Sequence, residues 1–298
     1  MISVVIPSYH SGHTISKCLD SLEKQSVKDD VEIIVVDSSD DRTPEIVAAR
    51  YARVQLIRLG AKADPGTARN IGVGRTTGDP VAFLDADCVA PPDWLDRMAT
   101  AHQSSYAAVG GIVRNSPDSD TVVGRAGYMA EFRDFLPDKG RQEVAHIPTC
   151  NISYKKRILK EYGLFDGKYY PQEDLLFNYR LYQRGEKILL DPDIQVWHQH
   201  RTRLGEFFLH QHRVGQATIR VLREIPLKGS GIAKRPLLSA CLAPLMAMIK
   251  FAGTVRAFSK WDLKFIAERP MVLPVLALGL MGWAIGFMET ACPNKTES

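Results

Sequence analysis

Residues 78–88 read GDPVAFLDADC, and this stretch decides the fold. Its middle, residues 81–84, is an unbroken apolar run of the kind that forms a parallel strand buried on both faces. The run ends in two carboxylates, Asp85 and Asp87, whose spacing sends both side chains to the same side of the chain. Ligands of an open α/β sheet bind outside the carboxyl ends of its strands, so this pair predicts a site for one cation or one polar ligand. The alternative is an ordinary strand exit with solvated or helix-capping Asp, because Asp-x-Asp is short and common.

The chain before this stretch alternates between strand and helix patterns. Apolar, β-branched runs predict strands at residues 2–6, 31–36 and 54–59. Spaced apolar residues and start signals predict helices at residues 14–22, 43–51 and 66–78. Thr14 is expected to cap the first helix, and Thr43 with Pro44 to open the second. This alternation is typical of an α/β fold with a doubly wound, mostly parallel sheet and flanking helices.

The chain after residue 88 continues with mixed elements. A helix is expected at residues 93–101, strands at 107–113 and 147–154, and one or two short strands within 187–197. Residues 114–145 are polar and irregular and are expected to run over the surface, either covering a binding site or as a mobile decoration. An amphipathic helix is expected to begin at Glu173 and to end at Gly185.

The bulk composition excludes several classes of protein. The chain has 298 residues and a net charge of +4, which is too mild to indicate a nucleic-acid partner. The five cysteines are scattered and lack Cys-x-x-Cys spacing, so neither a disulfide framework nor a zinc site is expected, and a reducing compartment fits best. No signal peptide is expected, because the first residues lead straight into a strand.

A second acidic pair, Glu173 and Asp174, stands in the first turn of a predicted helix. The helix macrodipole favours acidic residues at any such position. The functional alternative is that one of the two is a general base that takes a proton from an acceptor hydroxyl. Spacing in the sequence does not relate this pair to Asp87.

Four of the eight histidines fall in two His-Gln-His groups, each followed by an arginine. A zinc site of four histidines is disfavoured, because the two histidines of a His-x-His pair in a strand point to opposite faces. We expect His198 to reach the same cation as Asp87, and the other histidines of these groups to lie at the surface.

Together these motifs resemble the family 2 glycosyltransferases, which have the GT-A fold. The matching stretches are VVIPSY at 4–9, VVDSSDDRT at 35–43, GTARNIG at 66–72, FLDAD at 83–87, and GLFD at 163–166 ahead of Glu173 and Asp174. They occur in the order of the family and cover about residues 1–215. The resemblance implies an inverting hexosyltransferase that uses Mn²⁺ or Mg²⁺ and a nucleotide-diphosphate sugar, with UDP as the expected nucleotide.

The resemblance also implies a set of site residues. The nucleotide-sugar would be held by Pro7, Ser8, Tyr9, Asp37, Arg69 and Asp85. The metal would be held by Asp87, Asp85 and His198. Asp174, or alternatively Glu173, would be the catalytic base. The acceptor or diphosphate region would include Asn151, Trp197 and Arg213.

Two departures from the family pattern bear on the prediction. The acidic loop after the second strand is one residue short, which leaves the contact with the nucleotide base to Asp37. Polymer synthases of the family carry Gln-x-x-Arg-Trp, whereas residues 211–214 read QHRV, so a transferase that adds a single sugar is favoured.

The end of the chain is apolar. Residues 271–288 form an uncharged run of 18, which just reaches the ~17 to 25 residues of a transmembrane helix. Residues 236–255 are expected to form an interfacial or re-entrant helix, and the basic residues between the two runs are expected to stay cytoplasmic. A hydrophobic helical subdomain or a dimer interface is the soluble alternative.

The predicted organisation is therefore a catalytic domain at residues 1–225 and a membrane-associated tail at residues 226–298. The catalytic domain divides into a nucleotide-sugar half, about 1–113, and an acceptor half, about 114–225. It is expected on the cytoplasmic face of an inner membrane, acting on a lipid-linked or cell-envelope glycan. Two other functions are weighed: a nucleotidyltransferase that makes activated sugars, and a membrane-tethered subunit without catalytic activity. Residues 7–12, PSYHSG, lack the basic Gly-rich loop of the former, and the latter would have no reason to retain four acidic site residues.

Overall fold

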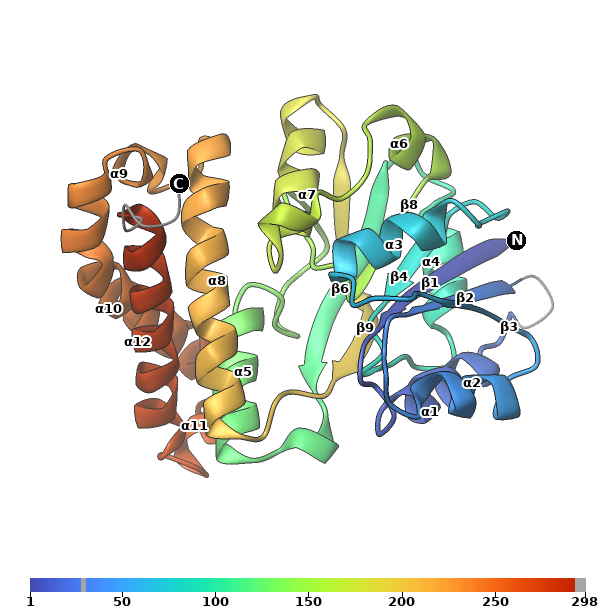
Figure 1. The fold of residues 1–298 in the computed structure, drawn as a ribbon, viewed down its shortest axis with the longest axis horizontal. Coiled ribbons are helices and arrows are strands. Elements are labelled where there is room, and N and C mark those ends of the chain that lie inside the picture. The colour runs from blue at the N-terminus through green and yellow to red at the C-terminus, as the bar shows by residue number, and fades with distance from the viewer. Residues whose placement is uncertain (28–30, 293–298) are drawn as a thin grey trace. The chain divides into compact units, whose positions relative to one another are not determined.

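The computed structural model describes residues 1–27 and 31–292. The chain divides into two compact units, which are described separately. The first unit comprises Met1–Arg114, Pro137–Lys168 and Glu173–His198. The second comprises Asn115–Leu136, Tyr169–Gln172 and Gln199–Ser298. Figure 1 labels the elements of both.

The first unit is built on a nine-stranded mixed sheet with the order β3-β2-β1-β4-β8-β6-β9-β5, in which β7 pairs with β9. The strands are β1 Ile2–Ser8, β2 Val31–Asp37, β3 Val54–Arg58, β4 Val81–Leu84, β5 Cys88–Val89, β6 Ala108–Asn115, β7 Gln142–Val144, β8 Asn151–Tyr154 and β9 Ile188–His198. The helices are α1 Ile15–Glu23, α2 Thr43–Arg50, α3 Pro65–Val73, α4 Trp94–Ala101, α6 Lys156–Glu161 and α7 Glu173–Gln183. The α/β prediction is confirmed.

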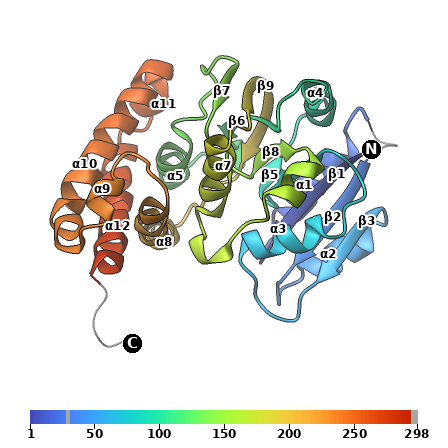
Figure 2. The ribbon, with the colours of Figure 1, turned by 90° about the horizontal axis from the view of Figure 1, so that it is seen from above.

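The first four strands are parallel, and Figure 2 shows β1, β2 and β3 side by side. Strands β1 and β4 are fully buried, which is why their sequences are continuous apolar runs. From β1 the chain moves outward to β2 and β3, and it then returns past β1 to β4. The crossover from β1 to β2 runs in one direction along the sheet and the crossover from β3 to β4 runs in the other. Because such crossovers are right-handed, their helices α1 and α3 lie on opposite faces of the sheet. The carboxyl ends of β1 and β4 therefore form the point at which such a sheet binds ligands.

Three elements differ in detail from the sequence predictions. Residues 122–132 form the helix α5, whereas the sequence predicts an irregular surface segment there. Its glycines hide the helical pattern, and the Thr121 side chain caps it by accepting a hydrogen bond from the Gly124 amide. Residues 188–198 form one long strand, β9. Asp64 caps α3, and its side chain accepts hydrogen bonds from the amide and hydroxyl of Thr67.

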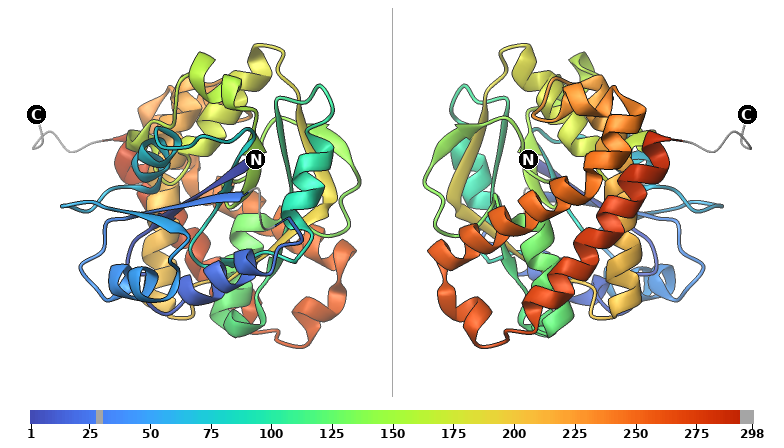
Figure 3. Two further views of the ribbon diagram at one scale, coloured as in Figure 1. Left: turned by 90° about the vertical axis from the view of Figure 1, so that its right-hand side faces the viewer. Right: turned by 90° about the vertical axis from the view of Figure 1, so that its left-hand side faces the viewer.

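The second unit is a bundle of helices, seen from two sides in Figure 3. Besides α5 Val122–Phe132 it contains α8 Leu204–Glu224, α9 Ser230–Ala233, α10 Pro236–Trp261, α11 Leu263–Ala267 and α12 Val272–Ala291. Helix α12 packs against α8, α10 and α5. The predicted domain boundary at residue 225 falls inside this unit, because α8 and α12 pack together.

Helices α10 and α12 are both long and apolar enough to cross a membrane. They differ in how much of each helix is buried inside the fold. In α12 half of the most apolar window is buried inside the fold, and Trp283 is buried with its Nε1 donating to the Thr218 hydroxyl at 3.1 Å. A Cβ added at Gly286 would lie 2.0 Å from the His212 carbonyl oxygen of α8, so only glycine allows the two backbones to come this close.

Candidate functional site

Polar side chains of the first unit gather at the carboxyl ends of β1 and β2, as the sequence predicts. Asp37 ends β2 and is buried, and its carboxylate accepts hydrogen bonds from the Ser8 hydroxyl at 2.6 Å and from the amide and hydroxyl of Ser39. Pro7 and Ser8 are also buried at the end of β1, so they support Asp37 from the neighbouring strand. Tyr9 is exposed, and the Lys62 ammonium lies 4.3 Å from the centre of its ring. An aromatic ring at the strand ends can stack on a nucleotide base.

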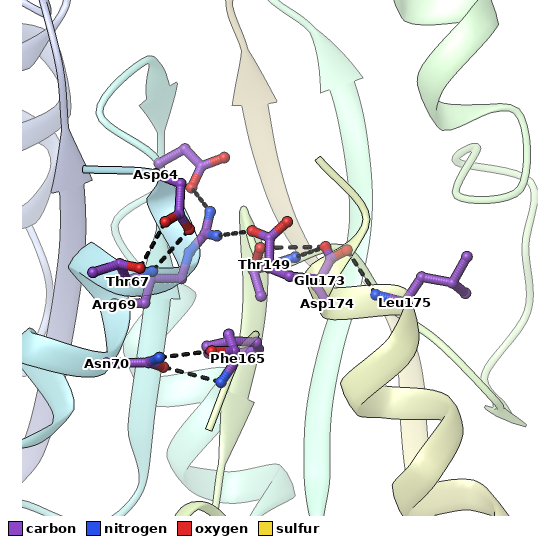
Figure 4. Close-up of polar contacts among 10 residues, drawn as sticks. Asp64, Thr67, Arg69, Asn70, Thr149, Phe165, Glu173, Asp174 and Leu175 are labelled. Atoms are coloured by element: carbon purple, nitrogen blue, oxygen red, sulfur yellow. Dashed lines mark hydrogen bonds and ion pairs between the residues drawn. The ribbon is translucent and has the colours of Figure 1, made fainter. Parts of the chain in front are cut away.

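The centre of the site is an arginine held between two acids (Figure 4). Arg69 of α3 donates from Nη2 to Asp85 at 2.6 Å and from Nη1 to Glu173 at 2.9 Å. The side chains of Arg69 and Glu173 are each 4% exposed, whereas that of Asp85 is 28% exposed. A Cβ at Gly66 would lie 2.9 Å from the Glu173 side chain, so the glycine of the GTARNIG motif makes room for this pair. The triad links the end of β4 to the start of α7.

Charge and burial compete within this triad. Burial alone would lower the pKa of Arg69, but the carboxylates of Asp85 and Glu173 outweigh it and raise that pKa above its usual value. Burial, together with the neighbouring charge of Asp174, raises the pKa of Glu173 to about 7, against the lowering effect of Arg69. Glu173 is thus enclosed, with its Oε1 paired to Arg69.

Asp174 has the opposite environment. It is only partly buried, and its Oδ2 accepts hydrogen bonds from the Thr149 amide at 3.0 Å and from the Thr149 hydroxyl at 3.3 Å. These bonds fix the carboxylate just before β8 while leaving part of it accessible. Of the two acids that the sequence offers as a base, Asp174 is the more exposed, and its Oδ1 also accepts a hydrogen bond from the Leu175 amide at 2.7 Å. Thr149 was not identified from the sequence, because a lone threonine in a loop carries no recognisable signal.

The pairing of β5 with β9 brings three side chains that can bind a metal close together. Cys88 lies directly opposite His198 in this antiparallel pair, so their side chains share one face. His198 Nε2 is 3.5 Å from Asp87 Oδ1, and Cys88 Sγ is 3.9 Å from the same oxygen. Ligand atoms of Asp87, Cys88 and His198 all lie within 4.8 Å of one another. The Asp87 carboxylate suits Mn²⁺ or Mg²⁺ and the His198 imidazole is a common metal ligand, so these two residues fit a divalent metal, whereas the Cys88 thiol is too soft a ligand for either ion.

Cys88 is the residue of this cluster that the sequence did not reveal. Asp85, predicted as a further metal ligand, instead directs its Oδ1 to Arg69. It keeps a second oxygen for a ligand, because a carboxylate offers about four acceptor positions.

The remaining predicted residues have varied settings. Asn151 is fully buried: its Oδ1 accepts from Trp94 Nε1 at 2.8 Å, and its Nδ2 donates to the carbonyls of Ile112 and Ile194. Its amide is therefore used to hold the sheet together, rather than facing an acceptor. Trp197 is partly buried on β9 opposite Val89. Arg213 is exposed on α8 of the second unit.

The expectation that the other histidines of the two His-Gln-His groups lie at the surface is wrong for His200 and His210. His200 and His210 belong to the second unit and are both largely enclosed, with side chains 1% and 12% exposed. His210 Nε2 lies 3.2 Å from Glu131 Oε1, and Arg201 is 3.9 Å from the same oxygen. Burial would raise the pKa of Glu131, but His210, His200 and Arg201 hold it well below its usual range. These histidines pair with a glutamate of α5, which the sequence did not show as a helix.

Comparison with known proteins identifies the family of the chain. The sequence pattern of the family described as "Glycosyl transferase family 2" matches residues 3–163, more than half of the chain. The glycosyltransferase AglE of Haloferax volcanii is 28% identical over 227 residues, covering 74% of this chain and 73% of AglE. The succinoglycan biosynthesis protein ExoO of Rhizobium meliloti is 42% identical over 199 residues, covering 63% of this chain and 54% of ExoO.

Solved structures share the fold. The mannosyltransferase PcManGT from Pyrobaculum calidifontis, in complex with GDP-Man and Mn²⁺, aligns with a TM-score of 0.65 at 18% identity, covering 96% of this chain and 86% of that one. The S. aureus TarS fragment 1–349, in complex with UDP-GlcNAc, aligns with a TM-score of 0.56 at 18% identity, covering 97% and 90%. These likenesses show the GT-A fold.

Proposed function

Because the chain belongs to glycosyl transferase family 2, we propose that it transfers a hexosyl unit from a nucleotide-diphosphate sugar to a hydroxyl group by a single inverting displacement. The observation that carries the proposal is the division of labour in the Glu173–Asp174 pair. Glu173 is enclosed and paired with Arg69, and Asp174 is held by Thr149 with part of its carboxylate accessible. An inverting transferase needs one such carboxylate, positioned and ionisable, on the acceptor side of the sugar.

In this mechanism Asp174 accepts the proton of the acceptor hydroxyl as that oxygen attacks the anomeric carbon. Thr149 restricts the carboxylate to one orientation through its amide and hydroxyl, which lowers the entropy lost on reaching the reactive geometry. Arg69 holds Asp85 at the end of β4, where a ribose or diphosphate would bind. Ser8 and Ser39 orient Asp37, whose remaining acceptor positions can meet an N–H of the nucleotide base.

Asp87 and His198, with the second oxygen of Asp85, would hold a divalent cation, Mn²⁺ or Mg²⁺. When bound there, such a cation neutralises negative charge on the leaving diphosphate as a Lewis acid. The protein's own contribution is to set Asp87 and His198 3.5 Å apart through the pairing of β5 with β9. The Mn²⁺ bound together with GDP-Man in the PcManGT complex supports this assignment.

The donor and acceptor are proposed by class. UDP is the expected nucleotide, and the UDP-GlcNAc and GDP-Man of the two solved complexes support a nucleotide-diphosphate sugar in general. ExoO is named for succinoglycan biosynthesis, which supports a cell-envelope or lipid-linked glycan as the acceptor. Such an acceptor agrees with a position at the cytoplasmic face of an inner membrane; the two apolar helices α10 and α12 support association with a membrane in general.

The test is calorimetric titration of the protein with UDP, GDP and dTDP, with and without Mn²⁺. We expect one nucleotide to bind in a metal-dependent manner and Asp87→Ala to abolish that binding. The matched control is Asp96→Ala, which removes an exposed carboxylate of α4 and should bind as the unmodified protein does. If no nucleotide binds in the presence of metal, the transferase proposal fails and a tethered subunit without catalytic activity becomes the better explanation.

A second variant separates binding from chemistry. Asp174→Asn should bind the donor nucleotide as tightly as the unmodified protein, since Asp174 is assigned to the acceptor side. It should lose transfer by two or more orders of magnitude, about the contribution of a general base. Retention of transfer by Asp174→Asn, together with its loss in Glu173→Gln, would reverse the assignment of the base.

A further inference from the structure

Helix α10 presents two different faces. Five residues of one side are buried against the helical bundle: Ser239, Ala243, Ala247, Thr254 and Phe258. Its other side carries exposed apolar residues: Pro236, Leu237, Leu238, Cys241, Pro244, Leu245, Met248 and Ile249, here called the α10 apolar face. The right-hand view of Figure 3 looks onto α10, in orange, and α12, in red.

The exposure of this face is large. Leu237, Met248 and Ile249 are 79%, 69% and 64% exposed, and Leu245 is 50% exposed. Single exposed apolar residues are ordinary, but a contiguous set on one helix marks a surface that binds a partner or a membrane.

The charges around the α10 apolar face indicate which partner it fits. Residues 225–261 contain six basic residues and no acidic residue: Lys228, Lys234, Arg235, Lys250, Arg256 and Lys260. Lys234 and Arg235 directly precede the apolar face, and Arg256 and Lys260 follow it on the exposed side of the same helix. An apolar strip with basic residues at both ends complements an anionic lipid surface, where each Lys or Arg contributes about 1 kcal/mol.

The dimensions favour a helix that lies on the bilayer. Helix α10 has 26 residues, but its uncharged part, residues 236–249, has only 14, or about 21 Å of helix, which is shorter than the roughly 30 Å hydrocarbon core. Lys250, which follows it, packs against the bundle with its ammonium 4.8 Å from the centre of the Trp283 ring.

Helix α12 is the other apolar helix, and the bundle already uses it. Added Cβ atoms at Gly282 and Gly286 would lie 2.9 Å and 2.0 Å from carbonyl oxygens of α8. Helix α8 carries charged residues such as Arg213 and Arg220 on its exposed side, and His212 Nε2 lies 2.8 Å from Glu289 Oε2 of α12. Crossing a membrane would require α12 to leave α8, whereas the α10 apolar face needs no rearrangement to meet lipid.

We propose that the second unit docks on an anionic bilayer through the α10 apolar face, with α10 lying in the plane of the membrane and no helix of the described chain crossing it. This inference deepens the proposed function, on which it rests for its purpose: the docked protein would meet a lipid-linked acceptor at the surface. The lipid binding itself requires only α10 and its flanking basic residues.

The experiment uses the full chain and a native probe. Cys241 lies on the α10 apolar face and is exposed, and Cys292 is the other exposed cysteine among the described residues. In a Cys292→Ser background, Cys241 is labelled with an environment-sensitive fluorophore and the protein is mixed with vesicles of phosphatidylglycerol and phosphatidylcholine, or of phosphatidylcholine alone. We expect the fluorescence of the label to shift to the blue and to brighten, and lipids spin-labelled near the headgroup to quench it. Binding should be weaker to vesicles of phosphatidylcholine alone and at high salt.

Variants locate the surface. Leu245→Glu with Ile249→Glu should lower affinity for the anionic vesicles at least tenfold, about the loss expected from two unburied apolar side chains. Leu209→Glu is the matched control, because Leu209 is 56% exposed on α8, away from the α10 apolar face, and it should change affinity little. Arg256→Ser with Lys260→Ser should reduce the preference for phosphatidylglycerol. Alkaline carbonate should release the bound protein from membranes.

Several results would overturn the docking proposal. Resistance to carbonate would show a spanning helix. A Cys241 signal that is unchanged by vesicles, with a dimer that Leu245→Glu dissociates, would assign the face to a second copy of the chain. Nucleotide titration of the same variants separates the two proposals. In the unmodified protein, metal-dependent nucleotide binding without vesicle binding would defeat the docking alone, and vesicle binding without nucleotide binding would defeat the transferase function alone. In Leu245→Glu with Ile249→Glu, nucleotide binding should remain intact while lipid binding falls.

Discussion

Replacing Arg69 by methionine tests the buried triad at the centre of the site. Arg69 and Glu173 are each 4% exposed, so the substitution leaves a buried carboxylate without its cation. Breaking a buried ion pair from one side typically costs about 3 to 5 kcal/mol. Arg97→Met is the matched control, because Arg97 is 41% exposed and its pair with Asp93 lies at the surface, where such pairs contribute about 1 kcal/mol or less.

The loss should depend on pH, and its sign follows from Glu173. The pKa of this carboxyl is raised to about 7, by burial first and then by the charge of Asp174. Removing Arg69 takes away an opposing influence, so the pKa rises further. A group whose folded-state pKa is raised makes the fold less stable as pH rises towards that pKa. The difference between the two proteins therefore grows above about pH 7, and about 2 kcal/mol of the total loss arises between pH 7 and roughly pH 8.5, so that the difference is smaller near pH 6.

Hydrogen exchange measured by mass spectrometry gives this local stability directly. Peptides that cover β4 and the start of α7 should exchange about two to four orders of magnitude faster in Arg69→Met at the higher pH, after correction for intrinsic rates. Adding Glu173→Gln to Arg69→Met should remove the part that depends on pH. Equal destabilisation at both pH values, or no rescue by Glu173→Gln, would refute the reasoning.

Three further predictions concern other parts of the chain. Thr149→Val should lower kcat about 2- to 13-fold without changing nucleotide affinity, since it removes one hydrogen bond to Asp174. Thr149→Ser should keep kcat near that of the unmodified protein. A change confined to nucleotide affinity would contradict the role of Thr149 in positioning Asp174. His102 has its pKa lowered to about 4 by burial and by Lys155, so its neutral form contributes stability above about pH 6.5 that is lost as pH falls towards 4. Acid unfolding of His102→Gln should be correspondingly less steep, and an unchanged acid profile would count against it. Gly286→Ala should destabilise the helical unit by about 1 to 3 kcal/mol, measured by hydrogen exchange of α12. Gly253→Ala is the control and should have little effect, because its added Cβ has no neighbour closer than 3.6 Å. Equal effects of the two substitutions would argue against close packing of α8 and α12.

The sheet and the acidic ends of its strands were predictable because both depend on local patterns. A run such as residues 81–84 must be buried on both faces, and the rule for open sheets then places Asp85 at a ligand site. The partners of these residues were not predictable. Arg69 meets Glu173 across 104 positions of sequence, and Asp174 meets Thr149 across 25. Contacts of this kind depend on how β4, β8 and α7 assemble, and no periodicity encodes them.

The cation cluster shows the same limit on a smaller scale. The sequence analysis paired His198 with Asp87 but did not include Cys88, because the position of Cys88 depends on the two-residue strand β5 lying opposite the end of β9. A strand this short has too little pattern to be recognised in sequence. It is nevertheless what brings a thiol, a carboxylate and an imidazole within 4.8 Å of one another.

The apolar C-terminal helices show where composition alone is ambiguous. A helix that is apolar on all sides is either a core helix or a membrane span, and the two have the same hydropathy. In α12 the glycines at 279, 282 and 286 are consistent with a membrane helix by composition, but in the fold they are the positions where Phe207, Phe208 and His212 of α8 approach most closely. In the stretch of α10 from residue 237 to residue 249, the buried residues Ser239, Ala243 and Ala247 are small and the outward-facing residues are large and apolar, the reverse of a helix folded into a soluble core. The membrane surface therefore belongs with α10, whose outward face is apolar and bracketed by basic residues, while α12 supplies the core on which α10 is mounted.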